Sequence, residues 1–208
     1  MMKQRDAKAT KNKILKVSED LFSRKGFDGT SVNEIVKTAE VNKALVYYYF
    51  ENKEGLLNSL IERLMDEIAE LMNNRIDQFN ALTDVESYKE TFKVFLEFIL
   101  SKKKIIRIAM QESVKSTEKP NFIFEICNKI IETELENIEA AYKNNGFHFE
   151  VEAHKFRINE FFTGIMPIIT YVIFEDDWMN TYSIDREAFQ EKFIESYFET
   201  HMKSHFRK

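Results

Sequence analysis

The stretch Ser31 to Lys53, SVNEIVKTAEVNKALVYYYFENK, decides the fold of this chain, because it has the pattern of two short helices joined by a tight turn. Ser31 stands three residues before Glu34, so its side chain can cap a helix while Glu34 reaches back to the cap. The residues that fall on one face of that helix are apolar, namely Val32, Ile35, Val36 and Ala39. The pattern predicts a short amphipathic helix whose apolar face needs a partner.

A second helix is expected from Lys43 onward, with Asn42 as a good N-cap. Residues 45–50, LVYYYF, have the composition of a buried strand. We predict a helix instead, because a strand needs pairing partners and no neighbouring segment alternates with period two. On a helix, Val46 and Phe50 can face inward only if some of the three tyrosines between them face the solvent.

Residues 14–57 resemble the DNA-binding domain of the TetR/AcrR family of bacterial transcriptional repressors. The residues at the family's spacing are Lys25-Gly26-Phe27, Thr30-Ser31, Ile35, Ala39, Val41, Tyr47, Tyr49, Phe50, Lys53 and Leu56. Two positions depart from the family pattern. Glu40 replaces the usual Gly, which predicts a strained turn. Leu45 replaces a small or hydroxyl residue, so that an apolar contact takes the place of a hydrogen bond.

The resemblance implies a helix-turn-helix whose second helix enters the major groove of double-stranded operator DNA. The residues expected at the base edges are Asn42, Lys43, Ala44 and Leu45. The residues expected to hold phosphates are Thr30, Ser31, Tyr47, Tyr49 and Lys53. The role of Tyr48 stays open.

Length and composition indicate an all-α globular protein. The chain has 208 residues, of which 44% are hydrophobic, and this is ample for a core. Five Gly and two Pro are few for an all-β fold, which needs many turns. We predict about nine helices, with a three-helix DNA-binding domain at residues 1–53 and a larger helical bundle for ligand binding and dimerisation at residues 54–208.

The formal net charge of −5 fits a DNA-binding protein only when it is divided along the chain. Residues 1–53 hold eleven Lys and Arg against seven Asp and Glu, a net charge of +4, which leaves −9 for the remaining residues. A basic N-terminal part on an acidic remainder suits a protein that touches nucleic acid at one end only.

The first helix is expected to be capped by Thr10 and to end at Lys25, with Gly26 closing it. A long helix follows the helix-turn-helix. We expect Asn52 to cap this long helix, which then runs to about Phe79 and joins the two domains.

Five further helices are expected after the long helix. Turn-forming residues place the breaks near residues 82–84, 101–104, 116–120, 144–146 and 180–183. The fourth of these helices spans about 152–176, and Gly164 and Pro167 should kink it. The fifth begins at Ser183 or Asp185.

A ligand site in the larger domain is one interpretation of its many aromatic residues, and an ordinary core is the other. The predicted kink favours a wide apolar cavity, because it would separate the helix from its neighbours. The candidate lining residues are Phe95, Ile99, Met110, Phe162, Gly164, Ile165, Met166 and Tyr171. The family resemblance implies a small effector, here hydrophobic or aromatic, and a homodimer through about 152–176 and 185–206.

Other chemistries find little support in the sequence. It has no Gly-rich phosphate loop and no nucleophile motif, so we expect neither an enzyme nor a cofactor. His201 and His205 stand four apart without an accompanying carboxylate motif, so we expect no metal site. The lone Cys127 fits a core position in a cytoplasmic protein. Residues 161–174 are apolar but too short to span a membrane, so we expect a buried helix.

The sequence therefore predicts a ligand-responsive transcriptional regulator, a repressor that binds a palindromic operator as a dimer. The alternative is a helical protein or enzyme that handles lipids or other hydrophobic ligands and keeps a vestigial helix-turn-helix.

Overall fold

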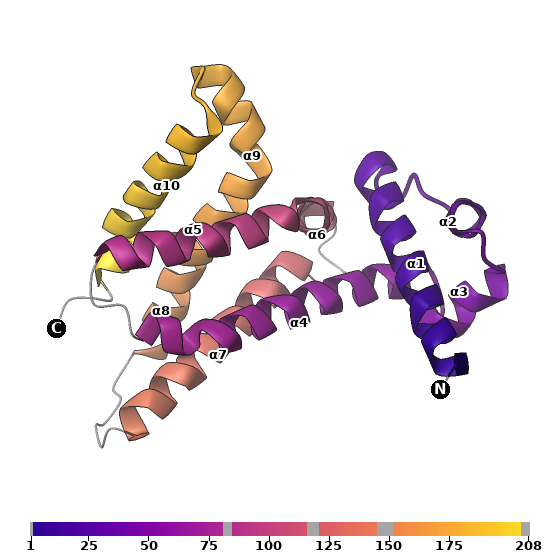
Figure 1. Cartoon of the computed structure of the whole chain (residues 1–208), viewed down its shortest axis with the longest axis horizontal. Coiled ribbons are helices and arrows are strands. Elements are labelled where there is room, and N and C mark those ends of the chain that lie inside the picture. Colours follow the sequence, from indigo (N-terminus) through magenta and orange to yellow (C-terminus); the bar gives the residue numbers. More distant parts are fainter. Residues whose placement is uncertain (1, 81–84, 116–120, 145–151, 205–208) are drawn as a thin grey trace. The chain divides into compact units, whose positions relative to one another are not determined.

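The computed structural model describes residues 2–80, 85–115, 121–144 and 152–204, and these residues are almost entirely helical (Figure 1). The N-terminal elements are α1 (Met2–Lys25), α2 (Val32–Ala39), α3 (Lys43–Phe50) and the long α4 (Lys53–Asn80). The following elements are α5 (Val85–Ser101), α6 (Lys103–Lys115), α7 (Phe122–Asn144), α8 (Ala153–Asn159), η1 (Glu160–Ile165), α9 (Met166–Tyr182), α10 (Arg186–Thr200) and η2 (Met202–Ser204).

The predicted all-α class is confirmed. Counting α8, η1 and α9 as one continuous helix and leaving out the single turn η2, the described ranges hold nine helices and no strand. The predicted breaks at 82–84 and 116–120, and most of the break at 144–146, lie outside the described residues.

Two compact units make up the chain. The first contains residues 1–70 and 104–123, and the second contains residues 71–103 and 124–208. The chain passes from one unit to the other within α4, again between Lys103 and Lys104, and finally after Ile123. The first unit therefore includes α6 as well as the helix-turn-helix, while the predicted domain boundary after residue 53 stays a prediction.

The caps of the first unit form as the sequence predicts. Ser31 Oγ accepts a hydrogen bond from the Glu34 amide at 3.2 Å, and Asn42 Oδ1 accepts one from the Ala44 amide at 2.8 Å. Asn52 Oδ1 accepts from the Gly55 amide at 2.7 Å and so opens α4. These bonds satisfy amide groups that have no partner within the helix.

Two local predictions are wrong. Thr10 does not cap α1, because the helix begins eight residues earlier, at Met2, and Thr10 Oγ1 donates to the Asp6 carbonyl at 2.8 Å. Residues 2–9 contain no Gly or Pro, so the helix extends through them to Met2. Glu34 does not return to its own cap, because its carboxylate binds the Lys25 ammonium at the end of α1.

The turn between α2 and α3 is strained, as predicted from the missing glycine. Glu40 has a left-handed backbone, with φ 51° and ψ 47°. Such a conformation costs a residue with a side chain roughly 1–2 kcal/mol. The Glu40 carboxylate lies 3.4 Å from the Lys13 ammonium, which offsets part of its negative charge.

In the second unit, a π turn lies at the position of the predicted kink. The hydrogen bonds of η1 widen the helix by one residue per turn over Glu160–Ile165, immediately before Pro167, which lies in the first turn of α9. The helix then continues to Tyr182, six residues beyond its expected end. Ser183 ends it in a left-handed conformation, and Asp185 caps α10 by accepting from the Ala188 amide at 2.9 Å.

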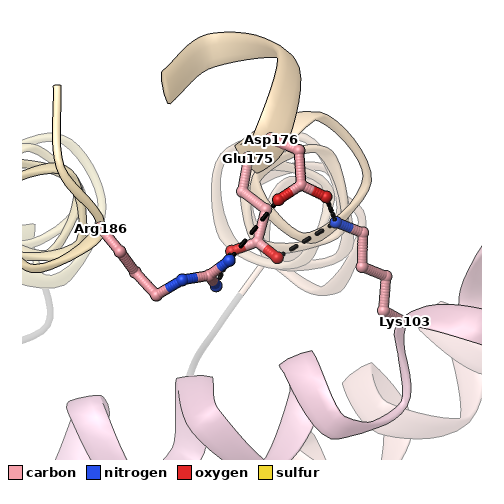
Figure 2. A network of polar contacts seen from close by, with 4 residues as sticks. All are labelled: Lys103, Glu175, Asp176 and Arg186. Carbon is pink, nitrogen blue, oxygen red and sulfur yellow. Dashed lines mark hydrogen bonds and ion pairs between the residues drawn. The ribbon is translucent and has the colours of Figure 1, made fainter. Parts of the chain in front are cut away.

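A network of four charged residues fixes the turn between α9 and α10 (Figure 2). The Glu175 carboxylate is 3% exposed and binds the Lys103 ammonium at 3.1 Å and the Arg186 guanidinium at 2.7 Å. Both cations also bind Asp176. The two cations balance the charge of the buried carboxylate, which would be costly to bury alone.

The run Ala153–Tyr182 is long and apolar enough, by length and composition, to cross a membrane. It shares little else with a membrane span, because the buried Glu160 and Glu175 lie on its inner side. It packs against α5 and α10 in the described structure.

The second unit also contains Cys127, which is fully buried. Burial raises the pKa of its thiol to about 12.

Candidate nucleic-acid interface

The helix α3 is held by its two buried apolar residues. Val46 is 0% exposed and Phe50 is 3% exposed, so both face the core formed with α1, α2 and the start of α4. The side chains between them are turned outward, with Tyr47 46% and Tyr48 79% exposed. The prediction of a helix with outward tyrosines is therefore confirmed, and the fold presents one aromatic face of α3 to the solvent.

Most of the residues expected to contact DNA lie on the surface of the first unit. The exposed ones are Ser31, Asn42, Lys43, Ala44 and Tyr47. Leu45 and Tyr49 are half-buried. Only the side-chain oxygen of Asn42 takes part in the cap, so the two N–H groups of its side-chain amide can donate to DNA.

Two of the expected phosphate contacts are occupied within the protein. Thr30 is 1% exposed, and its hydroxyl donates to the Gly26 carbonyl at 2.9 Å. The Lys53 ammonium donates to the carbonyl oxygens of Phe27 and Thr30 at 2.9 and 3.1 Å. It also lies 4.3 Å from the centre of the Phe27 ring. Both residues tie the end of α1 to the start of α4, and their phosphate roles stay predictions.

Replacing Lys53 by Met should lower the free energy of unfolding by about 1–3 kcal/mol, since hydrogen bonds to a charged group are lost. Urea denaturation followed by circular dichroism measures the effect. Lys43→Met is the matched control, because Lys43 is exposed, and its denaturation midpoint should stay unchanged. Equal midpoints for the two variants would show that the bonds of Lys53 to Phe27 and Thr30 contribute nothing to stability.

Tyr48 is a candidate contact that the sequence left open. It is the most exposed of the three consecutive tyrosines, and its ring packs edge-on against Tyr49 at 5.1 Å. The spacing in the sequence could have indicated this contact, because Tyr48 stands four residues after Ala44 and shares its face of the helix.

Acidic residues of the first unit are bound by lysines of α6. Lys104 lies 3.0 Å from Asp20, and its hydrogen bond holds the pKa of that carboxyl below its ordinary value. Lys115 lies 3.1 Å from Asp28. These pairs neutralise two of the seven acids of the basic N-terminal part, which leaves its positive charge less opposed.

The predicted pocket residues are spread over both units. Met110 belongs to the first unit, and the other seven belong to the second. Within the second unit, Ile99, Gly164 and Tyr171 are buried, and Phe95, Ile165 and Met166 are half-buried. Phe162 is 66% exposed, so its side chain lies on the surface of the single chain. Their role as a ligand pocket stays a prediction.

The helices α2 and α3 are capped and pack on a small core, and α3 exposes one face to the solvent. This arrangement is that of a helix-turn-helix DNA-binding domain. Residues 14–60 match the family described as "Bacterial regulatory proteins, tetR family". The N-terminal part of the chain is therefore similar to the DNA-binding domain of that family, as the resemblance of residues 14–57 indicated.

Similar proteins extend the likeness beyond this domain. The chain is 28% identical over 129 residues to the "Probable HTH-type transcriptional regulator YttP" of Bacillus subtilis, covering 57% of this chain and 62% of that protein. It is 34% identical over 71 residues to the biofilm operon negative regulator IcaR of Staphylococcus epidermidis, covering 34% and 38%. The chain therefore matches less than two thirds of the length of either relative.

A solved structure shares the whole fold. A transcriptional regulator from Aquifex aeolicus superposes with a TM-score of 0.62, at 28% identity, over 90% of this chain and 96% of that one. The second unit therefore has the fold that accompanies the helix-turn-helix in such a regulator.

Proposed function

We propose that this protein is a ligand-responsive transcriptional repressor that binds a palindromic operator as a homodimer. The observation that carries the proposal is the exposed face of α3, where Lys43, Ala44 and Tyr48 project from a helix that is capped at Asn42 and held by buried residues. A rigid helix with a cation and an exposed aromatic side chain suits insertion into a major groove.

A dimer face is available on the second unit. Five large apolar side chains of the run from α8 to α9 are at least half exposed, namely Ile158, Phe162, Phe174, Trp178 and Tyr182. They form two groups in which neighbours stand four residues apart and share one side of the helix, Ile158 and Phe162 before Pro167, and Phe174, Trp178 and Tyr182 after it. Exposed large apolar side chains gathered in this way favour a protein interface. We infer that a second copy covers this dimer face, which overlaps the first of the two segments predicted for dimerisation, 152–176 and 185–206.

Two-fold symmetry sets the geometry of the operator. In a dimer, the two α3 helices would enter successive major grooves about 34 Å apart, so the half-sites should be inverted repeats. Ser31, Tyr47 and Tyr49 would contact phosphates, while Asn42 and Leu45 would border the bases.

The effector belongs to the second unit. Its core contains many ring pairs, including Tyr171 stacked on Phe189 at 5.0 Å and Phe92 stacked on Tyr197 at 4.7 Å. A core rich in aromatic rings suits a small hydrophobic or aromatic ligand, because the ligand could replace one ring of such a pair and make the same contacts. An effector changes operator affinity only through its preference for one arrangement of the DNA-binding domains.

Lys43→Ala should relax sequence preference at one operator position by about 1–3 kcal/mol, because a side chain at a base edge carries specificity. The measurement is a binding selection of the purified protein and the variant on a library of randomised duplexes, followed by fluorescence anisotropy on the selected sequence and its single substitutions.

Tyr47→Phe serves as the comparison for Lys43→Ala. It removes only a phenolic hydroxyl that we place on a phosphate, so it should weaken binding to all sequences alike. A uniform loss for Lys43→Ala would move Lys43 to the phosphate contacts. If the selection enriches no sequence at low salt, the repressor proposal fails.

A further inference from the structure

A stack of three aromatic rings joins α9 and α10 in the second unit. Tyr171 and Trp178 stand two turns apart on α9, so they share one side of the helix and are separated by about 11 Å along its axis. Phe189 of α10 lies between them, with its ring centre 5.0 Å from that of Tyr171 and 5.9 Å from that of Trp178. Its plane is 21° and 16° from parallel to theirs. The two rings of α9 therefore form a position for one flat ring, and Phe189 occupies it.

The hydroxyl group at the inner end of this stack has no hydrogen-bond partner in the described part of the chain. It belongs to Tyr171, which is 4% exposed, and the oxygen itself is inaccessible to water at the surface. The carboxylate of Glu175 stands one turn further along α9. Its two oxygens are already bound, one by Lys103 and the other by Arg186. A buried hydroxyl without a partner is rare and costly in a folded protein.

The partner that this hydroxyl needs is a neutral hydrogen-bond acceptor. Burial, and next the negative charge of Glu175, raise the pKa of Tyr171 to about 12, so the hydroxyl keeps its hydrogen at neutral pH and can donate it. A ligand carboxylate is disfavoured as the acceptor. The cations Lys103 and Arg186 already bind carboxylates, and a further buried negative charge would be costly without a charged partner.

Phe189 fits the central position of the stack in shape but not in polarity. Its phenyl ring makes good stacking contacts on both sides, but it offers no acceptor to the hydroxyl of Tyr171. Phe189 is half-buried, so it is less firmly enclosed than the tyrosine beneath it. A flat ring that carries an acceptor would make the same stacking contacts and would also take the unpaired hydrogen.

We propose that the position held by Phe189 binds the ring of a small, neutral aromatic ligand whose acceptor atom takes the hydrogen of the Tyr171 hydroxyl. The ligand displaces Phe189 from the stack. Because Phe189 lies near the start of α10, its displacement shifts the first turn of that helix, which the Arg186–Glu175 ion pair holds against α9.

The consequence for DNA rests on the proposed function. The helix α10 belongs to the second segment predicted for dimerisation, so a ligand that shifts its first turn changes the arrangement of the proposed dimer and thereby operator affinity. The binding of the ring does not depend on that function, because all the residues involved lie in one chain and in one compact unit.

Pyridine and benzene are matched probes for this position, because they share one outline and only pyridine has an acceptor. Each is titrated at pH 8, where pyridine is neutral, into the full-length protein. The indole N–H signal of Trp178, the single tryptophan, is followed by nuclear magnetic resonance. In Tyr171→Phe, the affinity for pyridine should fall about three- to tenfold, the loss of one net hydrogen bond, while the affinity for benzene should stay unchanged.

Two further variants test the stack itself. Phe189→Ala removes the ring that the probes displace, so both should bind roughly tenfold more tightly or better. Tyr182→Phe is the matched control for Tyr171→Phe. It removes an exposed hydroxyl from a ring that lies 4.7 Å from Trp178, and it should leave both affinities unchanged.

A loss of pyridine affinity that is equal in Tyr171→Phe and Tyr182→Phe, or absent from both, would overturn the proposal. Weaker binding of the probes to Phe189→Ala, or no binding to this variant and to the unmodified protein, would overturn it as well. Tyr171→Phe should melt no lower than the unmodified protein, and a clear drop would show that the hydroxyl already has a partner. If pyridine binds as expected but operator affinity does not respond, the ligand response of the proposed function is contradicted and the binding position stands.

Discussion

Phe174→Glu should convert the proposed dimer to a monomer at micromolar concentration. Phe174 is 55% exposed on the proposed dimer face, and two-fold symmetry would place two new carboxylates in one interface. Burying an unpaired charge costs several kcal/mol per ion, and about 2.7 kcal/mol already weakens association a hundredfold. We therefore expect the dissociation constant of the dimer to rise at least a hundredfold, and operator affinity to fall with it.

The single tryptophan provides a direct measurement of this association. Trp178 is 50% exposed in one chain and lies on the same face, so its emission should shift to shorter wavelength as the dimer forms. The shift should depend on protein concentration in the unmodified protein and be absent in Phe174→Glu. Sedimentation velocity gives the mass independently.

Val114→Glu is the control for the general effect of adding a charge to an apolar surface. Val114 is 77% exposed and lies on α6, in the other compact unit. This variant should dimerise like the unmodified protein. If both variants stay dimeric, the exposed apolar side chains around Phe174 do not form the interface, and the dimer must use another surface.

Gly164→Leu should destabilise the second unit by about 2–4 kcal/mol, because extra atoms forced into a filled space displace their neighbours. The first added atom would lie 2.9 Å from the His201 ring and 3.1 Å from Glu160 Oε2. The predicted pocket role of Gly164 would give a different result, in which the larger side chain fills a cavity without loss of stability and changes operator affinity.

A double-mutant cycle identifies the cause of the loss. Gly164→Ala should cost stability in the unmodified protein and much less in a His201→Ala background, since the ring that the new methyl meets is then absent. Thermal unfolding followed by circular dichroism measures all four proteins. Additive effects would mean that Gly164 serves the backbone of the π turn and not the space for the ring.

The features that the sequence predicts well are those set by neighbours along the chain. Ser31, Asn42 and Asn52 cap helices because a side-chain oxygen reaches an amide two or three residues ahead, and Gly26 ends α1 with φ 77°. Such geometry needs no knowledge of the rest of the fold. Residues 45–50 form a helix for the same reason, since Asn42 starts it and the described part of the chain offers no strand to pair with.

The features that the sequence did not predict depend on residues far apart in the chain. Glu34 binds Lys25 instead of its own cap, and Lys53 binds carbonyl groups 23 and 26 residues before it. The π turn was predicted as a kink at Gly164 and Pro167, but the partner that occupies its inner side, His201, lies 37 residues later. A single sequence contains no signal for such pairs, because many residues of the same type could make them.

The compact unit that carries the helix-turn-helix is built from two separate pieces of chain, residues 1–70 and 104–123. Anyone who grafts this DNA-binding unit onto another effector domain therefore has to transfer α6 along with α1 to α4. A graft cut within α4 alone would leave Asp20 and Asp28 without their lysines, and it would lose the buried side chains of Ile105 and Ile108. Exchange of effector domains between such regulators, in the laboratory or in evolution, needs three compatible junctions instead of one.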